Sequence, residues 1–117
     1  MATVANSEIR CLTGYRFMWM MVMFDLPTVT KAEKKEYTRF RNFLLDNGFS
    51  MAQYSVYNRL LSSKDRVKTF ERRIACELPK QGKIHILTIT DKQYENIKSY
   101  NGYDPEFRQK PDQFHLF

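Results

Sequence analysis

The residue best suited to chemistry in this sequence is Asp25, which directly follows the strongly apolar run at residues 17–24. A carboxylate that leaves a strand buried on both sides needs a cationic or metallic partner, because an unpaired charge is costly to bury. The alternative is an acid that only helps to form the turn. A single carboxylate is a weak metal site. Mg²⁺ is often held by one or two carboxylates plus waters, so two copies of Asp25 across a twofold axis could bind it. Mg²⁺ there would polarise a phosphodiester and lower the pKa of a bound water.

Other residue types that commonly act in catalysis are not arranged for it. The sequence contains neither a G-x-G-x-x-G fingerprint nor a P-loop, and it has only four glycines. His85 and His115 have no acidic partner placed beside them, so we interpret both as structural or exposed. Cys11 and Cys76 could form one disulfide, but they lie far apart and outside any C-x-x-C pattern. We therefore interpret the two cysteines as reduced thiols in a cytoplasmic protein.

The net charge is positive, which narrows the class of partner. Nineteen Lys and Arg residues against thirteen Asp and Glu give a formal charge of +6 and a pI near 9.4. This excess favours polyanionic partners, nucleic acid first and a membrane surface second. The first fourteen residues lack the apolar segment of a secretory signal, and the run at 17–24 is far shorter than the ~20 residues that span a bilayer. We therefore predict a cytoplasmic protein without a membrane partner.

Apolar spacing and stop signals predict where strands and helices begin and end. Residues 15–24 lack polar alternation, which is typical of a strand covered on both faces, and Pro27 ends it. Thr30 and Glu33 fit a capping box at the start of a helix that stops at Gly48. The other predicted elements are strands at residues 49–53 and 54–61, a helix from Ser62 or Ser63 to Pro79, and a strand at residues 83–90.

This order predicts an α+β fold, the ferredoxin-like β-α-β-β-α-β sandwich. We expect a flexible lead-in at residues 1–14, one domain at 15–100, and a tail at 101–117 whose residues 112–117 form an extra C-terminal edge strand. Two helices cover only one face of a four-stranded sheet, yet the first and last strands are apolar on both faces. A second copy of the chain would cover the bare face, so we predict a sheet-to-sheet homodimer.

Basic residues gather on the helix faces that do not pack. On the first helix, Tyr37, Phe40, Phe43 and Leu44 share the apolar side, and on the second the apolar stripe is Val67, Phe70, Ile74 and Leu78. The predicted nucleic-acid-binding residues are Lys31, Lys34, Lys35, Arg39 and Arg41 on the first helix and Arg72 and Arg73 on the second, where Arg66 and Lys68 also lie outside the stripe. A solvated, charged surface is the alternative interpretation. Since no base-reading element is visible, binding to a duplex backbone should be independent of sequence and sensitive to salt.

Four motifs in this order resemble the CRISPR-associated protein two (Cas-two) family, most closely the branch that accompanies Cas-nine effectors. The resemblance covers about residues 15–100. The motifs are residues 24–28 (FDLPT), 40–45 (FRNFLL), 48–57 (GFSMAQYSVY) and 83–92 (KIHILTITDK).

The resemblance implies a homodimer of ferredoxin-like protomers that bridges two dimers of the CRISPR integrase (Cas-one) and holds the double-stranded protospacer DNA during spacer acquisition. Some family members also act as metal-dependent endonucleases on RNA or DNA. The family's metal-binding aspartate at the end of the first strand matches Asp25, which implies Mg²⁺ as the cofactor. The preceding residue is often Tyr in the family but is Phe24 here, so any role of that hydroxyl is absent.

The sequence therefore leaves more than one function open. In a binding and bridging subunit the helix cations do the work and Asp25 is structural, whereas in a nuclease paired Asp25 residues hold Mg²⁺. A third hypothesis is an endoribonuclease toxin of the VapD type, which shares the fold but has no integrase or repeat array beside its gene.

Overall fold

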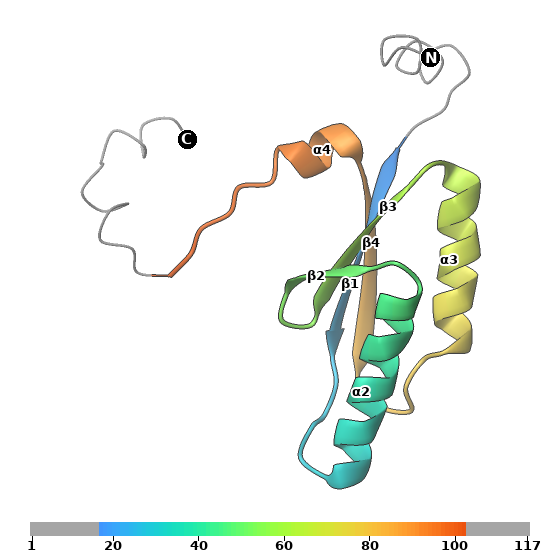
Figure 1. The fold of residues 1–117 in the computed structure, drawn as a ribbon, viewed down its shortest axis with the longest axis vertical. Coiled ribbons are helices and arrows are strands. Elements are labelled where there is room, and N and C mark those ends of the chain that lie inside the picture. Colours follow the sequence, from blue (N-terminus) through green and yellow to red (C-terminus); the bar gives the residue numbers. More distant parts are fainter. Residues whose placement is uncertain (1–16, 103–117) are drawn as a thin grey trace.

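The predicted order of strands and helices is confirmed. The computed structural model describes residues 17–102, so the lead-in at 1–14 and the edge strand at 112–117 lie outside the described residues. Along the chain the elements are β1 (Met18–Asp25), α2 (Lys31–Asp46), β2 (Ser50–Gln53), β3 (Val56–Leu61), α3 (Lys64–Cys76), β4 (Lys83–Thr90) and a short α4 (Asp91–Glu95), as Figure 1 shows.

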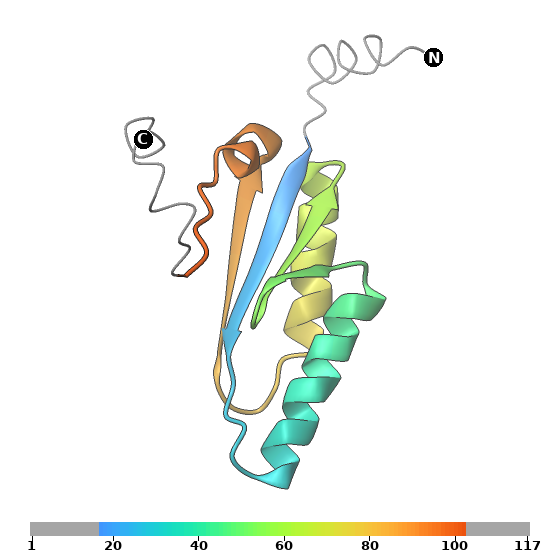
Figure 2. The same cartoon turned by 60° about the vertical axis from the view of Figure 1, so that its left-hand side comes forward.

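The four strands form one antiparallel sheet in the order β2-β3-β1-β4. Both long helices lie on the same side of this sheet, and α4 lies on the other side (Figure 2). The predicted capping box at the start of α2 is present, since Thr30 Oγ1 accepts from the Glu33 backbone N–H at 3.1 Å and Glu33 Oε1 accepts from the Thr30 backbone N–H at 2.9 Å. Gly48 follows α2 with φ +85°, a conformation that favours glycine.

The hydrophobic core lies between the sheet and the two helices. Met20, Val22 and Phe24 of β1 alternate into it and are buried. Phe40 and Leu44 of α2 and Val67, Phe70 and Ile74 of α3 are buried against them, which confirms most of both predicted apolar stripes. The prediction is wrong at Leu78, which is 52% exposed. Because α3 ends at Cys76, Leu78 no longer follows the helical spacing that would point it inward.

Within residues 17–102, the opposite sheet face is apolar and only partly covered. Trp19, Met21 and Met23 of β1 are half-buried there, and Leu60 of β3 and Leu87 of β4 are 42% and 46% exposed. The unpredicted helix α4 covers one end of this face. The ring of its Tyr94 stacks on Trp19 with centroids 3.8 Å apart, and Trp19 Nε1 donates to Asp91 Oδ1 at 2.8 Å. Over residues 17–102 there is no helix with the length and apolar character needed to cross a membrane.

Candidate functional site

Asp25 is exposed at the last position of β1, so the prediction that its carboxylate needs a partner because of burial is wrong. The residues of β1 before Asp25 are buried or half-buried, whereas Asp25 itself is exposed at the end of the strand. By strand alternation the residue belongs to the face away from α2 and α3, with Trp19, Met21 and Met23. Lys83 lies opposite Asp25 in the register with β4, and His85 lies opposite Met23. Within residues 17–102, Asp25 makes no ion pair.

The backbone around Asp25 is held by close packing. Gly82, with φ +98°, lets the loop between α3 and β4 approach so closely that an added Cβ would lie 2.6 Å from the Asp25 carbonyl oxygen. On the other side, the Phe24 N–H donates to the Ser55 carbonyl at 3.1 Å, and the Tyr37 and Ser55 hydroxyls are hydrogen-bonded at 2.9 Å. An exposed carboxylate on a fixed strand end is a suitable ligand for a hydrated cation.

Within residues 17–102, the end of β1 offers one carboxylate to a magnesium ion. The described part of the chain has no group of three His, Cys, Asp or Glu residues that could hold a metal ion. Since Mg²⁺ keeps several waters and takes one or two carboxylates, Asp25 fits such an ion as a single ligand that a second copy would complete.

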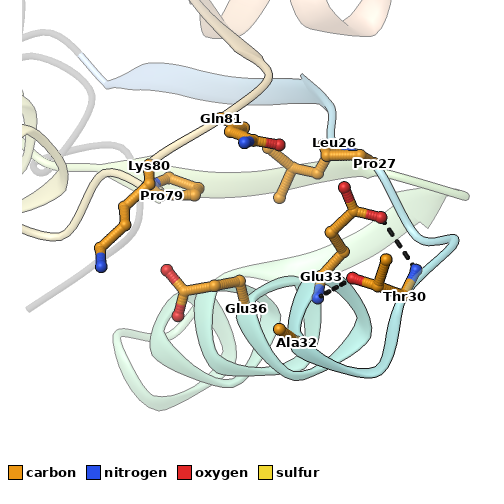
Figure 3. A pocket seen from close by; sticks show the side chains of 9 residues that line it. All are labelled: Leu26, Pro27, Thr30, Ala32, Glu33, Glu36, Pro79, Lys80 and Gln81. Carbon is orange, nitrogen blue, oxygen red and sulfur yellow. Dashed lines mark hydrogen bonds between the residues drawn. The ribbon is translucent and has the colours of Figure 1, made fainter.

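A pocket of about 260 Å³ next to the end of β1 is not a metal site (Figure 3). It lies between the loop after β1 and the loop after α3, with Leu26, Pro27 and Pro79 in its wall. Both carboxylates in its wall, Glu33 and Glu36, already accept hydrogen bonds from other residues. Glu33 closes the capping box, and the Thr30 backbone N–H lowers the pKa of Glu33. Glu36 accepts from Arg39 Nε at 2.9 Å, and this bond lowers the pKa of Glu36.

The five predicted cations of α2 differ in their surroundings. Lys31, Lys34 and Lys35 are exposed. Arg41 is half-buried, with a 3.5 Å hydrogen bond to Asn42. Arg39, however, joins two helices.

The sequence pattern predicts Arg39 on the solvated side of α2, but its side chain is only 39% exposed. Besides Glu36, it donates to Glu77 Oε2 at 3.1 Å and to the Glu77 carbonyl at 3.0 Å. Glu77 is the C-terminal cap of α3, so Arg39 ties the end of α3 to α2. These bonds raise the pKa of Arg39, Glu36 contributing most.

On α3 both Arg72 and Arg73 are exposed, as predicted for cations outside the stripe. The structure adds Arg59 and Arg66, which were not among the predicted binding residues. Together with Arg73, these two guanidinium groups lie within 5.1 Å of the centroid of the Phe70 ring. The spacing of Arg66, Phe70 and Arg73 along α3 was visible in the sequence, whereas Arg59 comes from β3 and no local pattern indicates it.

The family model for "CRISPR associated protein Cas2" matches residues 18–97 of the chain. The chain belongs to this family. A Cas2 relative from Paracidovorax avenae, named CRISPR-associated endoribonuclease Cas2, is 56% identical over 107 residues, which are 91% of this chain and 99% of that relative. One of the same name from Flavobacterium psychrophilum is 43% identical over 102 residues, 87% of this chain and 89% of the relative. The solved structure "Crystal structure of cas2" is 21% identical with a TM-score of 0.53, covers 76% of this chain and 91% of its own, and shows a similar fold.

Proposed function

We propose that this Cas2 family chain works as a homodimer in CRISPR spacer acquisition. In this proposal the dimer bridges two dimers of the CRISPR integrase and holds the double-stranded protospacer, in a system of the Cas-nine branch that the sequence motifs resemble. The observation that carries it is the uncovered apolar sheet face, where Leu60 and Leu87 are 42% and 46% exposed beside half-buried Met21 and Met23. A contiguous apolar face of this kind is typical of an interface.

Asn58 supports an interface on this face. It is only 7% exposed, and its Oδ1 has no hydrogen-bond partner among the described residues. Its Nδ2 makes a long bond of 3.4 Å to the Tyr94 hydroxyl. A buried acceptor without a donor is unfavourable, so a donor from a second copy would stabilise it. A hollow of about 400 Å³ beside Asn58, lined also by Met21 and Tyr94, leaves room for a partner's side chain.

The exposed cations support nucleic-acid binding by such a dimer. Lys31, Lys34 and Lys35 on α2 and Arg72 on α3 belong to the helix layer, on the other side of the sheet from the proposed interface. Dimerisation would leave them in solvent and double their number. Contacts of this kind reach phosphates and not base edges, so duplexes of any sequence should bind.

The test is to mix the purified chain with the CRISPR integrase and a protospacer duplex, and to measure the mass of the products by size-exclusion chromatography with light scattering. We expect one complex that contains two copies of this chain. A dimer that stays apart from both integrase and duplex would refute the bridging role. If that dimer also cleaved RNA, and its gene had no integrase or repeat array nearby, the toxin hypothesis would replace it.

Metal-dependent endonuclease activity is a second candidate, because the relatives are named endoribonucleases and because the exposed Asp25 is available to a cation. Mg²⁺ held by Asp25 from two copies would supply a Lewis acid and a water of lowered pKa. Asp25 would hold the ion. Lys83, which is exposed and opposite Asp25 in the register, would attract the phosphodiester. RNA is the favoured substrate because of the relatives' name.

A further inference from the structure

Three guanidinium groups surround one aromatic ring between β3 and α3. The Cζ atom of Arg59 lies 4.5 Å from the centroid of the Phe70 ring, and those of Arg66 and Arg73 lie 5.1 Å and 4.8 Å from it. Phe70 is 1% exposed, and a guanidinium group within about 6 Å of an aromatic centroid is attracted by the ring quadrupole. Any two of the three charges are therefore within about 10 Å of each other, which is roughly one Debye length in 0.1 M salt.

The innermost of these cations, Arg59, is held in place by its surroundings. Its Nη1 donates to the carbonyl of Asn47, the C-terminal cap of α2, and an added Cβ at Gly48 would meet the same Nη1 at 2.6 Å. Arg73 Nη1 donates to Asn47 Oδ1 at 3.3 Å. Two of the three cations, Arg59 and Arg73, are thus held by Asn47 before any ligand arrives, which lowers the entropic cost of binding.

None of the three guanidinium groups forms an ion pair with a carboxylate among the described residues, where both ion pairs belong to Arg39. The end of α2 offsets part of their charge, because its last carbonyls carry partial negative charge. Arg66 has no such offset, since it lies in the first turn of α3, where the helix dipole is positive. Burial, together with repulsion from Arg66 and Arg73, lowers the pKa of Arg59.

The donors of the cluster are mostly unused. A guanidinium has five N–H donors, whereas the hydrogen bonds within residues 17–102 take one from Arg59, one from Arg73 and none from the side chain of Arg66. Planar N–H forks match the oxygens of a phosphate and can bind two of them at once. An anion with several oxygens would fit this arrangement and relieve the repulsion.

We propose that Arg59, Arg66 and Arg73 form a binding site for a backbone phosphate of duplex nucleic acid, positioned over Phe70. The proposal rests on the proposed function, in which this chain holds a duplex. It adds the residues that would bind one backbone phosphate of that duplex. Arg59 lies opposite the core-facing Met20 in the sheet register, and Arg66 and Arg73 belong to α3. The site is therefore on the helix side of the sheet (Figure 2), which remains accessible in the proposed dimer. It is separate from the lysines of α2 and does not involve Arg39.

The test uses the full-length chain with short DNA duplexes of unrelated sequence, titrated at several salt concentrations. For each copy of Arg66 that contacts the duplex, we expect Arg66→Gln to weaken binding about tenfold whatever the duplex sequence, and to reduce the slope of log affinity against log salt by about 0.9. Arg66→Lys should recover only part of the affinity, because it keeps the charge but loses the fork. Lys68→Gln is the matched control, since Lys68 is an exposed cation on another side of α3, and it should change affinity far less. Arg66 is exposed, so thermal unfolding of its variants should match wild type.

The outcomes separate this site from the proposed function. If wild type binds duplexes and both Arg66→Gln and the double variant Arg66→Gln/Arg73→Gln bind equally well, the site is refuted and duplex binding stands. If wild type itself binds no duplex, the proposed function and the site fail together. If Arg66→Gln keeps duplex affinity but no longer joins the integrase, the cluster binds an acidic protein segment and the phosphate assignment is wrong.

Discussion

At the scale of single residues, the surroundings of a charge decide what it can do. Asp25 is exposed and unpaired within the described residues, so its carboxylate can bind a cation without first breaking a contact. Arg39 and Arg66 are both arginines on the helix layer, but the first has two carboxylate partners and the second has none in the described chain. Only a cation like Arg66 has its donors available for a phosphate.

We predict that Asp25→Asn lowers Mg²⁺-dependent cleavage of RNA at least about 100-fold, because the amide replaces an anionic ligand with a neutral one. Duplex affinity should not change, since Asp25 belongs to the sheet face away from the cations of the helix layer. The measurement is cleavage of a labelled RNA with Mg²⁺ and with a chelator. Asp46→Asn, at an exposed carboxylate on α2, is the control and should cleave like wild type. Undiminished cleavage by Asp25→Asn would place the hydrolytic site elsewhere.

At the scale of elements, the two helices are held to each other by charge as well as by the core. Arg39 on α2 reaches the C-terminal cap of α3, and its bond to Glu36 keeps it oriented. The arrangement places positive charge beside the last carbonyls of α3, which is the favourable end of the helix dipole. Arg39, one of the predicted nucleic-acid-binding residues, therefore connects α2 to the end of α3.

The Arg39–Glu36 pair within α2 predicts an acid-sensitive contribution to stability. The pKa of Glu36 is lowered from 4.5, chiefly by the hydrogen bond from Arg39. A lowered pKa means that the contribution is present above pH 4.5 and is lost as the pH falls through the folded-state value. Arg39→Gln should therefore reduce the free energy of unfolding near neutral pH and make its decline below pH 4.5 less steep. Glu33, whose pKa is also lowered, keeps some acid sensitivity in the variant.

Denaturant unfolding of both proteins across this pH range gives the measurement. Lys34→Gln, at an exposed cation of the same helix, should follow the wild-type profile. If the free energy of unfolding of Arg39→Gln declines as steeply below pH 4.5 as that of wild type, the Arg39–Glu36 pair makes no acid-sensitive contribution.

At the scale of the whole molecule, the two sides of the sheet have different tasks. The helix side buries the core and carries the cations, and the other side exposes apolar side chains that α4 covers only at one end. A dimer through the uncovered side would bury those side chains. It would also bring the strand ends that carry Asp25 onto the shared face.

We predict that Leu87→Glu raises the dimer dissociation constant at least about 100-fold, because a twofold interface would bury two like charges. Sedimentation at several protein concentrations measures it, and circular dichroism checks that the monomer is folded. The matched control is Leu45→Glu, since Leu45 is 38% exposed on α2 and lies on the helix side. If Leu87→Glu dimerises like wild type, this face is not the interface.

Local signals account for the part of the structure that could be predicted. The strand at residues 83–90 was predicted with the bounds that β4 has, and α2 begins after its predicted cap, Thr30. Apolar spacing in strands, helix caps and glycines at helix ends act over a few residues, so they can be recognised in the sequence. The position of Asp25 at a strand end follows from the same signals.

What only the tertiary structure decided depends on residues far apart in the chain. Arg39 contacts Glu77, 38 positions away in the sequence, and this contact makes Arg39 part of the link between α2 and α3. Trp19 contacts Asp91, 72 positions away, and this contact holds α4 against the sheet. The exposure of Asp25 and the position of Arg59 over Phe70 are decided in the same way. The sequence by itself determined the elements, their order and the family motifs, because these rest on local chemistry. Which charges are paired and which remain available was decided by folding, because pairing is a property of distance in space.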